Sequence, residues 1–184
     1  MNPVEKWSKK YPVSDREQRN TNNHSLEQES ENSRRMDENE LNAILKNTPG
    51  YLGTYARDEL NNLKISHYPS FIIVNLDLRK QNGSHWIAIA MFPNDVYICD
   101  SLGALMPTPH FPSQLINFLY RVSFQRRLHI TRRLQADNST NCGLYCIYFI
   151  HMMVKNNFAD FLSKFCNNYC LNDLIIELYF MNIL

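Results

Sequence analysis

Apolar positions follow helix or strand spacing from about residue 37 onward, and the segment before it has no such pattern. Residues 1–36 are rich in Asn, Ser, Glu, Gln and Arg, and their few apolar side chains show no sustained period. A segment of this kind buries too little apolar surface to offset the entropy lost on ordering. We therefore expect a disordered polar arm over residues 1–36 and one folded domain over residues 37–184.

Short apolar runs in the middle of the chain predict β-strands. They cover residues 70–76, 86–92 and 96–100, and the segment 93–95 (Pro-Asn-Asp) between the last two is typical of a hairpin turn. A hairpin brings the start of its first strand close to the end of its second. The pattern therefore predicts that His85 and Asp100 lie side by side. Alternation over residues 126–133 predicts a further strand.

Helical spacing appears on both sides of these strands. It begins at residue 37 and stops at Pro49-Gly50, and it returns in residues 112–124, 158–165 and 174–181. Residues 142–154 are apolar on nearly every face, which is typical of a buried helix. Helices grouped before and after the strands indicate an α+β domain rather than a doubly wound sheet.

Composition narrows the possible classes. A chain of 184 residues fits one domain, and 19 Lys+Arg against 18 Asp+Glu give a net charge of +1, so no overall field attracts nucleic acid or a membrane. The apolar stretch 144–154 is too short to span a bilayer, and residues 1–10 do not form a secretory signal. We expect a soluble, intracellular monomer in which the five cysteines are free thiols.

Cys142 is the candidate nucleophile, because Cys142-Gly143 stands where a polar loop meets the start of the buried helix. Unpaired backbone N–H groups and the positive helix end lower the pKa of a thiol at such a position. Gly143 leaves room for a substrate to approach the backbone. Cys142 can equally be one more small core residue, so its neighbours decide between the two interpretations.

Three polar residues complete a candidate site. His85 is the best placed of the six histidines to act as a base, and Asp100 can hold its imidazole in the tautomer whose free nitrogen faces the thiol. Gln135 lies seven residues before Cys142, across a loop long enough for its amide to donate to an oxyanion together with the Cys142 N–H. Taken singly, Asp100 reads as a strand-ending turn residue and Gln135 as a polar loop residue.

Two other groups carry weaker signals. Arg126, Arg127, Arg132 and Arg133 bracket a predicted strand and suit contact with nucleic-acid phosphates, although such arginines more often form a solvated strand face. The cysteine pair at 166 and 170 is one helical turn apart, but without a second pair it does not predict a metal site.

Jointly these residues resemble the adenovirus endopeptidase (adenain) family, in the clan that includes Ulp-type SUMO proteases. The family has the same order of residues: His85-Trp86, an acid at the end of the next strand, Gln135, and then Cys-Gly-Leu-Tyr-Cys at 142–146. Residues 51–55 are also similar to a segment near the start of the adenovirus enzymes. The resemblance implies a papain-like fold with a central mixed sheet, helices packed at both sides, and the catalytic Cys142 at the N-terminus of a buried helix.

The resemblance also implies a function. It points to a cysteine endopeptidase that cleaves precursor proteins of a virus or virus-like element, at small-residue or Gly-containing sites during particle maturation, in the host nucleus and the virion. Trp86 and Gly143 would line the cleft, no cofactor would be needed for the chemistry, and DNA or a peptide would be the activator. A disulfide-linked peptide activator is not expected, because no cysteine lies between Asp100 and Gln135.

Two other functions stay open. One is a Ulp-like deconjugating protease that removes SUMO or another ubiquitin-like tag. Asp100 stands where the adenovirus enzymes use Glu, so this residue does not distinguish an adenovirus-type protease from a Ulp-type protease. The other is a non-catalytic binding module that keeps the fold.

Overall fold

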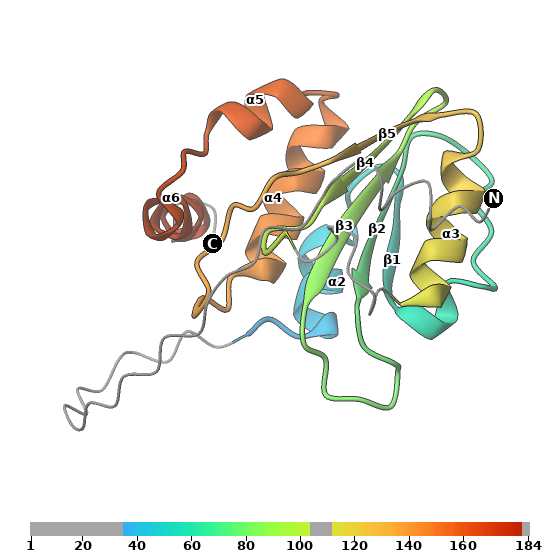
Figure 1. Ribbon diagram of the computed structural model, residues 1–184, viewed down its shortest axis with the longest axis horizontal. Coiled ribbons are helices and arrows are strands. Elements are labelled where there is room, and N and C mark those ends of the chain that lie inside the picture. The colour runs from blue at the N-terminus through green and yellow to red at the C-terminus, as the bar shows by residue number, and fades with distance from the viewer. Residues whose placement is uncertain (1–34, 104–111, 182–184) are drawn as a thin grey trace, which may run out of the picture.

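The computed structural model describes residues 35–103 and 112–181, and its centre is a five-stranded mixed sheet (Figure 1). In sheet order the strands are β1 (Tyr51–Ala56), β2 (Ser70–Asn75), β3 (Trp86–Met91), β4 (Asp95–Cys99) and β5 (Arg127–Ile130). Strand β1 is parallel to β2, and β5 is parallel to β4. Strand β3 is antiparallel to both β2 and β4. The predicted α+β class with a mixed sheet is confirmed.

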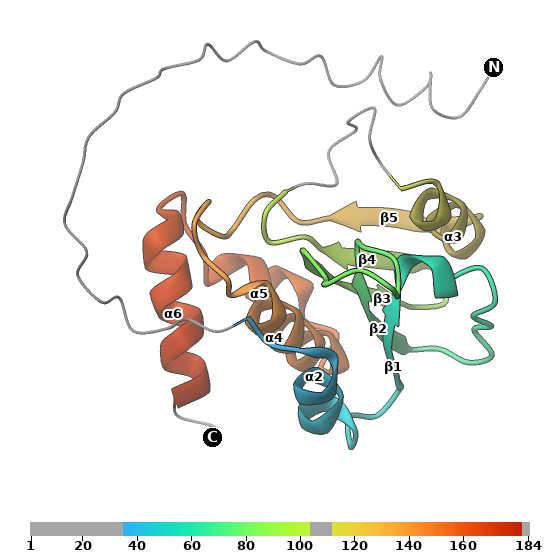
Figure 2. The ribbon, with the colours of Figure 1, turned by 90° about the horizontal axis from the view of Figure 1, so that it is seen from below.

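Helices cover both faces of the sheet (Figures 1 and 2). They are α2 (Glu38–Leu45), α3 (Ser113–Ser123), α4 (Cys142–Val154), α5 (Phe158–Ser163) and α6 (Tyr169–Met181), with a 3-10 turn at Arg57–Glu59. Helix α3 packs on one face, whereas α4 packs on the other and lies between the sheet and α6. No helix in the described part of the chain is long and apolar enough to cross a membrane.

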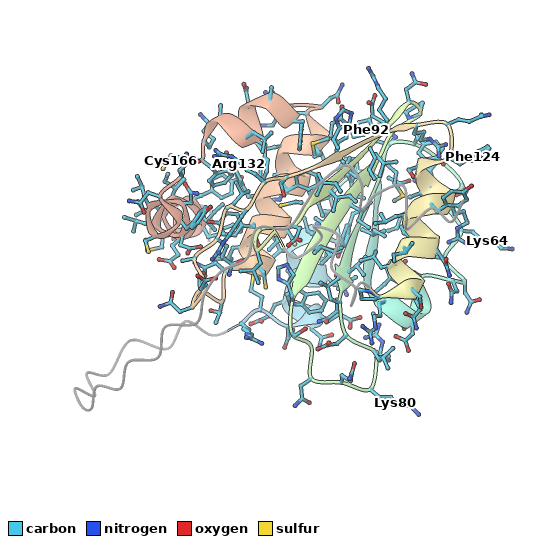
Figure 3. All side chains as sticks on the ribbon, in the orientation of Figure 1. Lys64, Lys80, Phe92, Phe124, Arg132 and Cys166 are labelled. Carbon is cyan, nitrogen blue, oxygen red and sulfur yellow. The ribbon has the colours of Figure 1, made fainter. Side chains whose placement is uncertain are left out.

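Alternation along β3 divides the apolar side chains between two cores. Ile87 and Ile89 face α3, whereas Ala88 and Ala90 face α4. Side chains fill the space between the sheet and the helices on both faces (Figure 3). The two alanines leave room for the large buried side chains of α4, and each fully buried Leu, Ile or Phe stabilises the fold by about 1.5–3 kcal/mol. The N-terminus of α4 thereby lies beside the start of β3.

The largest differences from the sequence-based prediction are at β1 and α6, and β5 and α5 are shorter than the predicted ranges 126–133 and 158–165. Strand β1 was not expected, because Gly53 interrupts its alternation, and the pairing of β1 with β2 shifts register at this point. Helix α6 begins at Tyr169 rather than at residue 174. Of the polar arm, residues 1–34 lie outside the described residues. The described chain enters α2 through Asp37, whose side chain accepts a hydrogen bond from the Glu40 N–H in a capping box.

Candidate active site

Cys142 is the first residue of α4, and its side chain is 4% exposed. The residue before it, Asn141, makes no side-chain cap, and its amide Nδ2 donates to Glu177 on α6 at 2.7 Å. The first N–H groups of a helix have no intrahelical acceptor. The start of α4 therefore presents N–H groups and the positive end of the helix dipole to the sulfur.

His85 is the last residue of the loop that connects β2 to β3. The Leu76 N–H donates to the His85 carbonyl at 3.0 Å and ties the two ends of this loop together. The chain turns back at Gly83, where φ is +78° and a Cβ atom would lie 2.5 Å from the Asn75 amide nitrogen. The imidazole is 6% exposed, so the base is held in a nearly closed position.

The imidazole of His85 lies between Asp100 and Cys142. Its Nε2 is 2.7 Å from the Asp100 Oδ1, as the hairpin argument predicts. Its Nδ1 is buried without an ordinary hydrogen bond, and the interaction of His85 with the Cys142 side chain raises the pKa of the imidazole. Since Nε2 donates to the carboxylate, the neutral imidazole keeps its lone pair on Nδ1, on the side of the sulfur.

Asp100 is fully buried at the end of the hairpin. Its backbone N–H donates to the Thr131 Oγ1 at 3.0 Å, and the same hydroxyl lies 3.2 Å from the Asp100 carbonyl. Thr131 follows β5, so the parallel pairing of β4 with β5 sets this contact. A fixed carboxylate of this kind orients the imidazole and stabilises its charged form.

The charges of the pair favour a thiolate facing an imidazolium. Burial opposes the charged imidazole, but the hydrogen bond and charge of Asp100, with the Cys142 thiolate, outweigh it and raise the pKa of His85 to about 9. Burial also opposes ionisation of Cys142, but His85 and the backbone N–H groups of Trp86 and Gly143 lower its pKa below the ordinary thiol value. By contrast, burial raises the pKa of Cys99 and Cys146 well above that value.

Gln135 lies near the pair but is bonded elsewhere. It is fully buried, and its Oε1 accepts from the Ser101 hydroxyl at 2.7 Å, next to Asp100. Its Nε2 donates to the Ser139 carbonyl at 2.9 Å and lies 3.1 Å from the Ser139 Oγ. The loop curls back as its length predicts, but the amide N–H groups point to Ser139 in this conformation.

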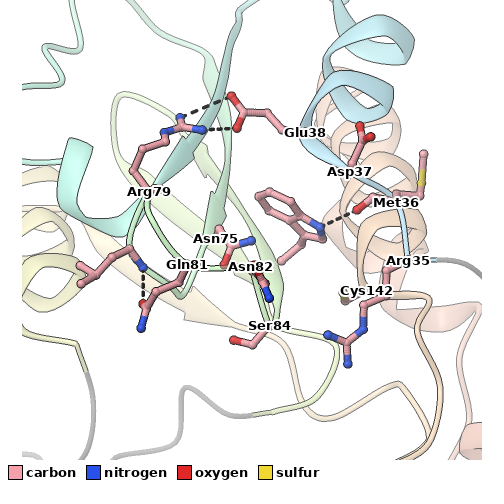
Figure 4. Close-up of a pocket in the computed structure, with 14 residues that line it drawn as sticks. Arg35, Met36, Asp37, Glu38, Asn75, Arg79, Gln81, Asn82, Ser84 and Cys142 are labelled. Atoms are coloured by element: carbon pink, nitrogen blue, oxygen red, sulfur yellow. Dashed lines mark hydrogen bonds and ion pairs between the residues drawn. The ribbon is translucent and has the colours of Figure 1, made fainter.

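A cavity of about 260 Å³ opens beside the sulfur (Figure 4). Trp86 and Cys142 both line it, and the Trp86 Nε1 donates to the carbonyl of Met36 at 2.9 Å. Met36 also lies against Gly143, where an added Cβ atom would be 3.1 Å from the Met36 Cβ. The segment before α2 therefore forms one wall of the cavity, with Arg35 beside it.

The four arginines around β5 all contact other parts of the chain. Arg126 donates to the carbonyls of Pro93 and Val122 and stacks over Tyr68. Arg127 pairs with Asp95. These contacts join β5 to the turn and strand beside it, so Arg126 and Arg127 both bind other residues of the chain.

Arg132 and Arg133 contact the region around α6. Arg132 donates to the Phe165 carbonyl and to Asn167, and it lies near Cys166 in Figure 3. Arg133 donates to the Gln135 carbonyl and stacks over Tyr169. Contact of these side chains with nucleic acid stays a prediction.

Several residues around the pair gave no signal in the sequence. Met36 lies in a segment without apolar periodicity, Ser101 is an ordinary polar residue after a predicted strand, and Thr131 is one inside a predicted strand. Their contacts depend on pairings between segments far apart in the chain. Over the described ranges, no group of three or more His, Cys, Asp and Glu side chains is arranged to hold a metal ion.

Comparison with known proteins adds to this geometry. A family model described as adenovirus endoprotease matches residues 51–174. The protease of Bovine adenovirus 2 is 30% identical over 141 residues, which are 64% of this chain and 63% of that protein. The protease of Bovine adenovirus B serotype 3 is 29% identical over 143 residues, 64% of each. The chain thus spans less than two thirds of the length of these relatives.

A solved structure resembles the fold. The crystal structure of the ASFV pS273R protease superimposes with a TM-score of 0.55 at 16% identity, and the match covers 79% of this chain and 67% of that chain. At this identity the likeness concerns the fold alone.

Proposed function

The chain belongs to the adenovirus endoprotease family, and on that premise we propose that it is a cysteine endopeptidase. The observation that carries the proposal is the row Cys142, His85 and Asp100, in which a buried carboxylate holds an imidazole whose free nitrogen faces a thiol of lowered pKa. Such a row is the arrangement that activates a thiol as a nucleophile.

The proposed reaction begins with attack of the Cys142 thiolate on a peptide carbonyl carbon. The carbonyl electrons move to oxygen, and the backbone N–H of Cys142 lies at the helix start where it can donate to the resulting oxyanion. The imidazolium of His85 then protonates the leaving nitrogen as the C–N bond breaks. Neutral His85 next takes a proton from water, which attacks the thioester and releases the thiolate. Side chains and water suffice for these steps.

In this mechanism the side-chain amide of Gln135 changes its hydrogen-bond acceptor. Its amide donates to Ser139 in the free protein, and we propose that one N–H moves to the oxyanion when a substrate occupies the cavity. Catalytic hydrogen bonds often form only in the complex with substrate. Removal of one such donor costs about 100-fold or more in kcat in other acyl-transfer enzymes.

The relatives indicate the class of substrate. Because they are proteases of adenoviruses, we propose that this protein acts on viral precursor proteins, as a monomer, in the nucleus of the host cell and in the virion. Small residues such as Gly on the substrate would suit a cleft narrowed by Met36 and Trp86. Activation by DNA or by a peptide belongs to the same proposal.

Two sets of substrates test the proposal. The protein is incubated with short Gly-containing peptides and, separately, with SUMO or ubiquitin joined to a fluorophore through the terminal Gly-Gly; a Cys142→Ala variant is the control. We expect cleavage of the peptides, which the control lacks. Turnover of the conjugates alone would replace the proposed function by deconjugation, and turnover of neither would favour a binding module. New termini in virus structural proteins, mapped by mass spectrometry, would then give the cleavage site.

A further inference from the structure

The loop that precedes the nucleophile is held by α6. This loop, residues 134–141, contains Gln135 and ends at Asn141. Three hydrogen bonds join the helix to the loop. They are Asn172 to the Leu134 carbonyl at 2.9 Å, Asp173 to the Ala136 N–H at 3.1 Å, and Glu177 to the Asn141 side chain at 2.7 Å.

Asp173 is at the centre of these contacts. Its Oδ2 accepts from the Ala136 N–H and its Oδ1 accepts from the Tyr145 hydroxyl, both at 3.1 Å. Tyr145 lies one turn after Cys142 on α4, so a single carboxylate joins the loop to the helix that carries the nucleophile. The carboxylate is 7% exposed, and both of its oxygens are used.

Gln135 lies between Leu134 and Ala136, two of the three loop residues that α6 holds. Its own backbone N–H donates to the Ser101 carbonyl at 2.9 Å, whereas the peptide groups on either side are bonded to Asn172 and Asp173. The side chain of Gln135 therefore projects from a backbone whose position depends on α6. An acyl-transfer site loses rate steeply when a donor is displaced, and a shift of about 1 Å can cost about 100-fold.

We propose that Asp173 is a positioning residue, which sets the place of Gln135 and of the residue 134–141 loop relative to Cys142. The inference rests on the proposed function, because it concerns the oxyanion step of that reaction. Asp173 does not contact the reacting atoms. It acts by holding the Ala136 amide and the Tyr145 hydroxyl, which belong to the two segments that meet at the oxyanion.

The variant Asp173→Asn tests this role, because it keeps the shape of the side chain but turns one acceptor oxygen into a donor. The groups that donate to Asp173 are the Ala136 N–H, the Tyr145 hydroxyl and the Ser139 side chain, and at least one of them then faces an NH₂ group. The matched control is Leu174→Ala, on the same helix but with an exposed side chain that makes no bond to the loop. If Asp173→Asn does not fold, Asp173→Ser keeps one acceptor and is used instead.

Three measurements separate positioning from general damage. They are kcat and KM for a Gly-containing peptide, the inhibition constant of the matching peptide aldehyde, and the rate at which iodoacetamide alkylates Cys142. The aldehyde adds to the thiol so that its oxygen occupies the oxyanion position, whereas alkylation forms no oxyanion. Hydrogen exchange of the Ala136 amide reports on the loop itself.

We expect kcat to fall by about 10-fold to 100-fold in Asp173→Asn, with parallel loss of aldehyde affinity and faster Ala136 exchange. KM and the alkylation rate should stay within about twofold of wild type, and Leu174→Ala should match wild type in all five quantities. Wild-type kcat in Asp173→Asn, or alkylation that slows as much as kcat, would overturn the inference. Absence of turnover in the wild-type protein would instead reject the proposed function. In that case the role of Asp173 in holding the loop is tested by exchange alone, and an unchanged rate of Ala136 exchange in Asp173→Asn would overturn it.

Discussion

The pairing of Cys142 with His85 makes a prediction about the reactivity of the thiol at acid pH. In the wild-type protein the sulfur faces an imidazole that keeps its proton up to about pH 9, and its own pKa is lowered. The perturbation is His85→Gln, which removes the positive charge but keeps a side chain able to donate to Asp100. We expect alkylation of Cys142 by iodoacetamide at pH 6 to slow markedly in this variant.

The size of the effect follows from the ionised fraction. A thiol with the ordinary pKa of 9.0 is ionised to about one part in a thousand at pH 6. If His85 keeps the wild-type thiol ionised at that pH, the thiolate population differs by at most about 1000-fold. A thiolate of lower pKa is a weaker nucleophile, with a Brønsted coefficient of about 0.4–0.5, which reduces this upper limit on the ratio of rates to the order of 10-fold to 30-fold.

The assay measures the alkylated fraction of each cysteine by mass spectrometry between pH 5 and pH 9. Cys166 and Cys170 are exposed and serve as references within the same molecule. The wild-type advantage should shrink as the pH approaches 9, because His85 loses its proton and an ordinary thiol ionises in the same range. Superimposable pH–rate curves for the two proteins would refute the ion pair.

Three further predictions concern neighbouring residues. Asp100→Asn removes the negative charge that helps to raise the pKa of His85, so kcat should fall about 100-fold or more and the alkaline limb of its pH profile should move to lower pH; an unmoved limb would contradict this. Gln135→Ala should lower kcat about 100-fold and, by urea titration, reduce the free energy of unfolding by about 1–3 kcal/mol, because two serines lose a partner; unchanged values would remove both roles. Trp86→Phe should speed hydrogen exchange in the segment around Met36 and lower stability by about 1 kcal/mol, through loss of the indole N–H bond; exchange at the wild-type rate would show that this bond does not hold the segment.

The fold was predictable where apolar spacing alone decides the structure. Helix α4 begins at Cys142 and ends at Val154, as its uninterrupted apolar run indicates. The hairpin prediction placed His85 beside Asp100 because antiparallel pairing depends only on local order and turn length. Elements of this kind can be predicted from the spacing of apolar residues within one short segment.

The rest depended on contacts between distant segments. Asn172 and Asp173 lie near the start of α6, just before the helix that the sequence predicts over residues 174–181, and the structure buries them because they bind the loop at residues 134–136. Gln135 was expected to present its amide to an oxyanion, but its partner in the structure is Ser139. Polar side chains find partners through tertiary packing, and the sequence contains no period from which such partners follow.

The register of the β3–β4 hairpin has a consequence for how the chain can change in length. Ala88 pairs with Cys99 and Met91 with Val96, and this ladder places Asp100 within 2.7 Å of His85. Sliding one strand by one residue would displace Asp100 by about 3.4 Å, more than a hydrogen bond tolerates. Insertions at the tip of the turn leave the ladder intact, whereas a single deletion inside β4 would separate the acid from the base. Length variation among functional homologues should therefore be confined to the turn.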